Sequence, residues 1–326
     1  MVTREMRVTP QPDCMLCGHR GELAYLGLKD RLFGAPGEWD LHRCGNRDCG
    51  LYWLNPMPVA EDISIAYEGY YTHACADEDG EPWGRRQSLL DHWYRVILDL
   101  TATTEARQAA RDLYLGDTRP GRLLEVGCGD GSHLLRLKAL GWEVEGQDID
   151  HGAGAHSLKD GDILVHKAPI EELHLPDNRY DAIVMNHVIE HAVNPHALLR
   201  ECRRLLKREG QLVLVTPNAL SFGHLFLRAR WMHLDPPRHL FLFSVRSLPA
   251  LVRKAGFSRV DAWSSAANAG SVGVVSWDIL TRGRHKMDEP PTVIPRLVGV
   301  GFQIAASLAI KIRRNCGEEV VLRAWK

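Results

Sequence analysis

A glycine-rich turn between two acidic residues is the chemically most distinctive segment of this 326-residue sequence. The apolar run LLEV (123–126) carries Glu125, and three glycines then alternate from Gly127 to Gly131. Glycines at such a turn let the backbone bend sharply and let a ligand approach closely. Asp148 ends the next apolar run, about 20 residues on, where a carboxylate can accept hydrogen bonds from both ribose hydroxyls. The pattern predicts a strand–turn–helix unit that binds a nucleoside cofactor.

The charge at this turn distinguishes between two cofactors. The dinucleotide fingerprint has Gly or Ala five residues after its first glycine, and here Ser132 holds that position. Glu125 would also add negative charge beside the pyrophosphate of a dinucleotide. S-adenosylmethionine has no phosphate, and its amino and sulfonium groups are cationic. The sequence therefore favours S-adenosylmethionine, with S-adenosylhomocysteine as product, over NAD.

Four cysteines near the N-terminus have metal-type spacing. Cys14 and Cys17 form a C-x2-C pair, and Cys44 and Cys49 form a C-x4-C pair. Four thiolates supply the closed tetrahedral shell of a structural zinc site. We therefore predict a small zinc-ribbon-like module over residues 1–60, in which Zn²⁺ has a folding role. Two unrelated pairs of free thiols are the alternative.

The elements that position the glycine turn follow from apolar runs of strand length. The runs are LLEV (123–126), WEVEGQ (142–147), ILVH (163–166), YDAIVM (180–185), QLVLV (211–215) and EEVVLRAW (318–325). Helical patterns lie between several of them, and one is capped by Asn194 with Pro195 in its first turn. Strands that alternate with helices predict a parallel sheet covered on both faces.

These patterns suggest three domains along the chain. The breaker DTRPG (117–121) separates a predicted helical connector or lid over 61–119 from a cofactor-binding domain over 120–326. A helical insertion is expected within that domain at about 264–316.

The segments EVGCGDG, QDID and YDAIVMNHVIEH, followed by LLRECRRLLKREGQLVLVTPN, resemble the core of class I methyltransferases. They are most similar to the group that contains the ubiquinone-type O-methyltransferases. The resemblance covers about 120–260 and implies a Rossmann-like α/β fold with a seven-stranded, mostly parallel sheet and a final antiparallel strand. It implies cofactor contacts from Glu125, Gly127, Cys128, Gly129, Asp148, Ile149, Ala168, Asn186 and His187. In that family the glycine turn holds the methionine end, the acid after the second strand holds the ribose, and the loop near Ala168 lies against the adenine.

The N-terminal segments CMLCG, RCGNRDCGLYWLNPMP and AYEGYY resemble the zinc domain attached to bacterial sugar methyltransferases. The resemblance implies a glycan-type or secondary-metabolite acceptor. In related enzymes the YEGYY stretch closes over the cofactor, which implies that Tyr70 or Tyr71 bonds the methionine carboxylate. For Tyr67, aromatic packing between modules is the alternative.

Two loops after predicted strands offer groups that could take a proton from the acceptor. NHVIEH (186–191) contributes His187, Glu190 and His191. For Glu190 and His191 the alternative is local hydrogen bonding that fixes the loop. HLDPPRHLFLFS (233–244) contributes His239. A histidine in this PRH setting reaches toward the acceptor in similar methyltransferases, so the resemblance makes His239 the leading base candidate. Its alternative is a loop-bracing role.

The remaining sequence constrains the partners and the compartment. Residues 297–314 form an apolar run with basic residues at its end, which favours a core or dimer-interface helix, with contact to a membrane surface as the alternative. A homodimer is therefore one expectation. Eight cysteines without a disulfide-type pattern and an N-terminus without an apolar leader predict a cytoplasmic protein.

The expected function is methyl transfer to a small hydroxylated metabolite or glycan-related acceptor, with oxygen preferred over carbon or nitrogen. Ribosomal RNA base methylation and a non-catalytic scaffold that binds S-adenosylmethionine are the alternatives. The formal net charge of −1, and the lack of a basic stripe with interleaved aromatic residues in 1–60, argue against a nucleic-acid partner.

Overall fold

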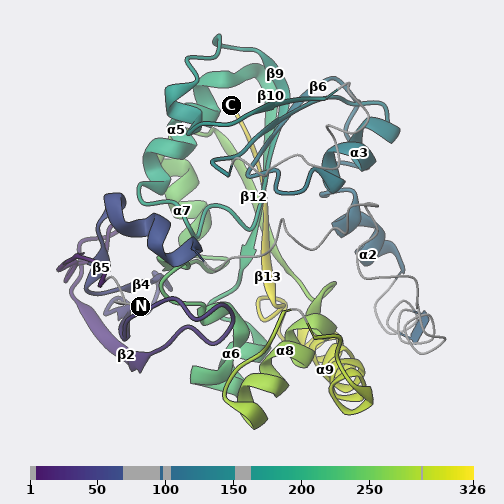
Figure 1. Cartoon of the computed structure of the whole chain (residues 1–326). Coiled ribbons are helices and arrows are strands. Elements are labelled where there is room, and N and C mark those ends of the chain that lie inside the picture. Colours follow the sequence, from purple (N-terminus) through teal and green to yellow (C-terminus); the bar gives the residue numbers. More distant parts are fainter. Residues whose placement is uncertain (1–4, 69–95, 98–103, 151–162, 288) are drawn as a thin grey trace.

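A seven-stranded sheet forms the centre of the molecule (Figure 1). The structure, a computed structural model, describes residues 5–68, 96–97, 104–150, 163–287 and 289–326. Neighbouring strands pair in parallel, except that β13 is antiparallel to both of its neighbours. The predicted mostly parallel sheet with an antiparallel final strand is therefore confirmed. In sheet order the strands are β12 (Arg259–Ser265), β13 (Glu319–Trp325), β10 (Leu206–Pro217), β9 (Tyr180–Asn186), β6 (Arg122–Val126), β7 (Glu143–Gln147) and β8 (Leu164–His166).

Both faces of the sheet are buried, because successive residues of the central strands enter two different cores. Leu124 of β6 and Ile183 of β9 belong to the larger core, whereas Leu123 and Val184 of the same strands belong to the smaller one. Side chains alternate across a strand, so a strand covered on both faces reads as a continuous apolar run. This is why the strand runs could be recognised in the sequence.

Helices cover the two faces (Figure 1). One face carries α2 (Thr104–Arg111) and α3 (Ser132–Ala139), and the other carries α5 (Pro195–Leu205) and α7 (Ser247–Lys254). The predicted cap of α5 is confirmed, since Asn194 Oδ1 accepts a hydrogen bond from the Ala197 amide at 3.0 Å and Pro195 is the first helical residue. Leu198, Leu199 and Cys202 of this helix are buried against the sheet.

The N-terminal segment forms a second, smaller sheet in the order β11-β4-β3-β2. Three of its strands are β2 (Gly21–Leu28), β3 (Trp39–Cys44) and β4 (Tyr52–Leu54). The fourth, β11 (Phe241–Leu242), comes from far along the chain and pairs Phe241 with Trp53. A short pair, β1 (Val8–Thr9) with β5 (Met57–Pro58), and the 3-10 helix η1 (Ala60–Tyr67) complete this part. The small sheet is therefore joined to the loop that follows β10.

Three further helices gather at the end of the large sheet where β13 begins (Figure 1). They are α6 (Phe222–Leu227), which follows β10, and the pair α8 (Ala269–Arg282) and α9 (Val293–Ile312), which lies between β12 and β13. Ser265, the last residue of β12, pairs with Glu319, the first residue of β13. The carboxyl ends of the parallel strands and these helices therefore share one end of the molecule.

Candidate active site

The turn between β6 and α3 has the backbone that its glycines predict. Gly127, Gly129 and Gly131 all have positive φ, and Gly127 has φ +69°. A Cβ at Gly127 would lie 2.4 Å from Cγ2 of Val188, which belongs to the loop after β9. Only glycine combines this backbone conformation with so close a neighbour. The turn between β6 and α3 is therefore in direct contact with the loop after β9, which carries candidate acid–base residues.

Glu125 lies beneath this turn with one oxygen available. It is 1% exposed, and its Oε1 lies 3.1 Å from Nδ1 of His133. Among the residues that the structure describes, Oε2 has no hydrogen-bond partner. Burial raises the pKa of Glu125, and the bond to Glu125 raises the pKa of His133. A buried carboxylate with an unused oxygen is a site that a cationic group would stabilise.

Asp148, at the end of β7, is fixed against the glycine turn. Its Oδ2 accepts a hydrogen bond from the Gly129 amide at 2.9 Å, and its Oδ1 accepts one from the Asp150 amide at 3.0 Å. The neighbouring Ile149 is exposed, with 64% of its surface accessible. The backbone bonds therefore orient the carboxylate beside the turn, where the sequence predicts a ribose.

Two other predicted cofactor residues lie around the same turn. Cys128 is buried, and its Sγ would be 2.8 Å from a Cβ at Gly146, so it packs under the turn. The carbonyl of Ala168, after β8, accepts a hydrogen bond from Nε2 of Gln147 at 2.7 Å. This bond ties the loop after β8 to the end of β7.

His187 joins two acidic residues at the end of β9, directly after the half-buried Asn186. Its Nδ1 lies 3.3 Å from Oε1 of Glu190, and its Nε2 lies 3.3 Å from Oε1 of Glu319 on β13. Burial alone disfavours a charged ring, but the bonds to the two carboxylates raise the pKa of His187 to about 10. His187 is therefore an imidazolium at neutral pH.

Glu190 is the buried centre of the cluster. Its Oε2 accepts a hydrogen bond from Thr216 Oγ1 at 2.8 Å, and its backbone carbonyl accepts one from the Leu240 amide at 2.9 Å. Burial alone would raise the pKa of this carboxyl group, but the bond to His187 lowers the pKa of Glu190 to about 2. Glu190 is therefore ionised and connects β9, β10 and the loop before β11.

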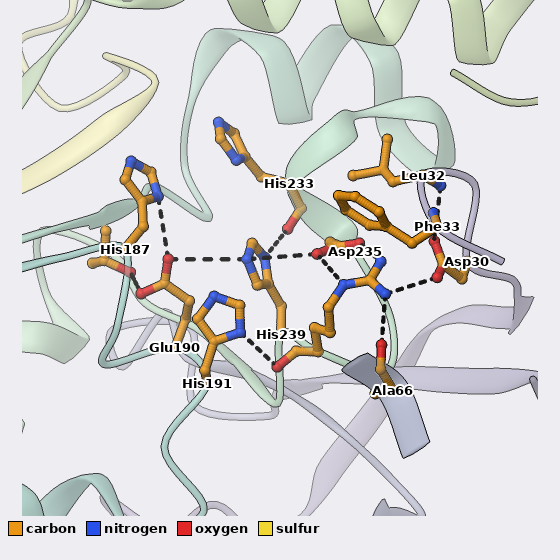
Figure 2. Close-up of polar contacts among 12 residues, drawn as sticks. Asp30, Leu32, Phe33, Ala66, His187, Glu190, His191, His233, Asp235 and His239 are labelled. Atoms are coloured by element: carbon orange, nitrogen blue, oxygen red, sulfur yellow. Dashed lines mark hydrogen bonds and ion pairs between the residues drawn. The ribbon is translucent and has the colours of Figure 1, made fainter. Parts of the chain in front are cut away.

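His191 and His239 meet next to Glu190 (Figure 2). Their ring centroids are 4.7 Å apart, and ring and carboxylate atoms of Glu190, His191 and His239 lie within 4.8 Å of one another. Burial and the neighbouring His239 lower the pKa of His191 to about 4, so this ring is neutral at neutral pH.

His239 has the orientation of a potential base. Its Nδ1 lies 2.7 Å from the carbonyl of His233. A carbonyl only accepts hydrogen bonds, so Nδ1 carries the proton and the neutral ring has its lone pair on Nε2. That Nε2 lies 3.9 Å from Oε1 of Glu190 and 4.0 Å from Oδ2 of Asp235. The two carboxylates would stabilise the positive charge if His239 took up a proton.

The loop that carries His239 is held by the fully buried Arg238. Nη1 of Arg238 bonds Oδ2 of Asp30 at 2.8 Å and the Ala66 carbonyl at 3.0 Å. Asp235 bonds the other side of the guanidinium, and the ring of Phe33 lies 4.6 Å from Cζ. Asp30, Phe33 and Ala66 belong to the N-terminal part of the chain, so this part holds the loop that carries His239.

Of the three tyrosines in the YEGYY stretch, the structure describes one. Tyr67 contacts the cluster, with its hydroxyl 3.0 Å from Nδ1 of His191. Tyr70 and Tyr71 lie outside the described residues.

The four N-terminal cysteines converge on one point. Sγ of Cys14 lies 3.7 Å from that of Cys49, and Sγ of Cys17 lies 3.3 Å from that of Cys44. All four sulfur atoms lie within 4.8 Å of one another. A tetrahedral zinc ion with Zn–S bonds of about 2.3 Å requires sulfur atoms about 3.8 Å apart. The donor set and its spacing fit such an ion.

Comparisons with known proteins place this fold and site in a family. The profile of a family described as a methyltransferase domain matches residues 98–262, half of the chain. A ubiquinone biosynthesis O-methyltransferase of Cereibacter sphaeroides is 31% identical over 241 residues, which cover 70% of this chain and 92% of that protein. The chain belongs to the S-adenosylmethionine-dependent methyltransferases.

Two other comparisons are narrower. A probable S-adenosylmethionine-dependent methyltransferase of Mycobacterium tuberculosis is 32% identical over 136 residues. The match covers 41% of this chain and only 46% of that relative's length. The crystal structure of a methyltransferase from Archaeoglobus fulgidus aligns with 73% of this chain and 98% of its own, at 20% identity and a TM-score of 0.46.

S-adenosylmethionine fits the residues at the turn of this methyltransferase. Oε2 of Glu125 has no partner among the described residues, so a cationic amino group would stabilise it. Gly127, Gly129 and Gly131 put no side chain between the backbone of the turn and a ligand. Sequence reasoning missed three groups that hold the neighbouring histidine cluster: Asp30, Arg238 and Glu319. Arg238 stands in the PRH motif and Glu319 in the last apolar run, but neither position reveals its distant partner.

Proposed function

We propose that this methyltransferase transfers a methyl group from S-adenosylmethionine to a hydroxyl oxygen of a small acceptor. The contact between Gly127 and Val188 carries the proposal, because it sets the cofactor turn beside the histidine cluster after β9. The printed name of the Cereibacter sphaeroides relative, an O-methyltransferase of ubiquinone biosynthesis, supports oxygen as the atom methylated.

We assign the cofactor-binding roles as part of this proposal, guided by the positions described above. Glu125 receives the amino group of the cofactor, and Asp148 receives the ribose hydroxyls. The loop at Ala168 borders the adenine, and Asn186 and His187 line the cofactor at the end of β9. His187 is held by two carboxylates, so we assign it an orienting role rather than that of the base.

His239 is the proposed general base. The cofactor supplies a methyl group that is already activated by its sulfonium, so the protein has to orient the acceptor and remove a proton. Nε2 of His239 takes the hydroxyl proton as the oxygen–carbon bond forms and the carbon–sulfur bond breaks, which leaves S-adenosylhomocysteine. Glu190 and Asp235 stabilise the resulting imidazolium. The neutral His191 beside it is the second candidate.

The cysteine cluster is proposed to hold one structural Zn²⁺. Four thiolates leave no open coordination position for a substrate, so this ion acts on folding and not on the reaction.

Calorimetry and turnover together test the proposal. Titration with S-adenosylhomocysteine should release heat at a 1:1 ratio, whereas titration with NAD should not. Labelled S-adenosylmethionine offered with catechols, phenols and nucleotide sugars should methylate a hydroxyl compound, and His239→Gln should slow that turnover about 10²- to 10⁴-fold without loss of S-adenosylhomocysteine binding. Tight donor binding without any methylated product would favour a scaffold instead, and NAD binding would overturn the cofactor assignment.

A further inference from the structure

One face of α9 is apolar and faces outward. Exposed apolar residues recur along it at helical spacing, and Leu297 and Ile312 are 65% and 89% exposed. Positions separated by three, four or seven residues share one side of a helix. The outward face consists of Val293, Ile294, Leu297, Ile304, Leu308 and Ile312. A surface helix of a soluble domain normally shows polar residues on this side.

The opposite face of α9 is fixed to the rest of the protein. Pro295, Gly299, Gln303 and Ala306 are buried. Gln303 accepts a hydrogen bond from the Gly270 amide at 2.9 Å and donates one to the Ala266 carbonyl at 2.7 Å. By length and composition alone α9 could cross a membrane. The buried amide and its two bonds instead favour a helix that stays on the protein and exposes one apolar side.

Basic residues flank α9 in the sequence. Residues 269–315 contain seven Lys or Arg and three Asp or Glu, a formal charge of +4 in a chain whose net charge is −1. Lys311, Arg313 and Arg314 at the end of α9, and Arg284 and Lys286 before it, are exposed. A second copy of the chain would bring the same positive charge against itself, whereas anionic lipid headgroups would neutralise it.

The neighbouring helix α6 exposes apolar residues as well. Leu225 and Phe226 of α6 are exposed, Phe226 by 73%. Phe222 of α6 packs against Phe302 of α9, with ring centroids 5.5 Å apart. Both helices lie at the end of the sheet where the parallel strands finish (Figure 1). We propose that α9, with α6 beside it, docks the protein on the surface of an anionic lipid bilayer, its apolar face in the interfacial region and its basic residues among the headgroups. This inference stands apart from the identity of the methyl acceptor.

Flotation with lipid vesicles tests the proposal on the full chain. Vesicles of phosphatidylcholine with roughly one quarter phosphatidylglycerol should carry the protein upward, and pure phosphatidylcholine vesicles should carry much less. Raising sodium chloride to about 0.5 M should weaken the binding to the anionic vesicles. The double variant Leu297→Glu/Leu308→Glu should lose about tenfold or more in apparent lipid affinity.

Two further variants keep the test decisive. Leu26→Glu, at an exposed apolar position on β2, serves as the matched control and should bind like the wild type. Arg313→Ser/Arg314→Ser, which leaves the apolar face intact, should lose binding to anionic vesicles only. Failure of the wild-type protein to float would overturn the proposal. So would a stable dimer by light scattering that Leu297→Glu/Leu308→Glu dissociates, because a second copy would then be the occupant.

Discussion

Gly127 and Val188 touch so closely that no side chain fits between them: a Cβ on the glycine would lie 2.4 Å from Cγ2 of the valine. The two residues belong to different loops, one after β6 and one after β9. Their contact sets the proposed methionine site beside the loop that carries His187, Glu190 and His191, and His191 of that loop packs against the proposed base His239.

Gly127→Ala should therefore disrupt cofactor binding. The methyl group meets Val188, and the positive φ is unfavourable for alanine, so the loop must move. We expect S-adenosylhomocysteine affinity to fall about tenfold or more in calorimetry, in line with a strain of about 1–3 kcal/mol. Gly116→Ala is the matched control, because nothing lies within 4 Å of a Cβ there. Equal affinities for the two variants would contradict the proposed role of the contact.

Asp148→Ala should weaken binding of S-adenosylhomocysteine by about 10- to 100-fold, the effect of losing charge-assisted hydrogen bonds to the ribose. Part of the loss arises because the Gly129 amide loses its partner. Adenosine competition separates the two effects: a ribose contact predicts that adenosine binding suffers as well. An unchanged affinity for both ligands would remove Asp148 from the site.

The pair of His187 and Glu190 predicts how stability depends on pH. The pKa of His187 is raised from 6.5 to about 10, so its contribution is complete below pH 6.5 and disappears as the pH rises toward 10. The pKa of Glu190 is lowered from 4.5 to about 2, so its contribution is complete above pH 4.5 and disappears as the pH falls toward 2. Urea unfolding of wild type and His187→Gln should therefore differ most between pH 4.5 and 6.5. A difference independent of pH would contradict the ion pair.

Arg238→Met should destabilise the fold strongly, because Asp30 and Asp235 would lose their buried partner. Removing one member of a buried ion pair costs about 3–5 kcal/mol in the free energy of unfolding. Arg246→Met, which loses an exposed contact of 3.8 Å to Asp48 and an exposed hydrogen bond of 3.2 Å to the Arg47 carbonyl, should cost less than about 1 kcal/mol. Urea unfolding of both variants measures the contrast, and similar losses would argue against the anchoring role of Arg238.

Cys14→Ser should lower the zinc content of the purified protein and unfold the small sheet preferentially. One thiolate fewer opens the tetrahedral shell, and folding of such modules depends on metal binding. Elemental analysis and limited proteolysis check the two effects. Cys316→Ser, outside the cysteine cluster, should keep the wild-type metal content. A wild-type protein without zinc and with an intact N-terminal part would refute the zinc proposal.

Three of the strands that sequence analysis found have apolar residues on both faces. LLEV, YDAIVM and QLVLV lie within β6, β9 and β10, where burial on two sides leaves an unbroken apolar run. The strand β12, RVDAWSS at one edge of the sheet, escaped recognition because it has no apolar run. Its residues Arg259, Asp261 and Ala262 are exposed and give no clear pattern.

Local motifs predicted the site residues better than their partners. Glu125 and Asp148 follow from a short strand–turn–helix pattern, and the sulfur spacing of the four cysteines follows from two local pairs. Arg238 bonds Asp30, which lies 208 residues away in the sequence, and β11 and β4 are separated by a similar number of residues. Periodicity in a single sequence carries no signal for such distant contacts.

The pairing of β11 with β4 connects the small sheet that carries the cysteine cluster to the loop that carries His239. If the metal stiffens the small sheet, it also restricts the fluctuations of the loop that presents the base. Coupling between two binding sites is reciprocal. If bound metal raises the affinity for the acceptor by some factor, a bound acceptor that orders this loop raises the affinity for the metal by the same factor. An ion with no role in bond making would then raise the population of the ordered loop, and the bound acceptor would in turn slow loss of the ion.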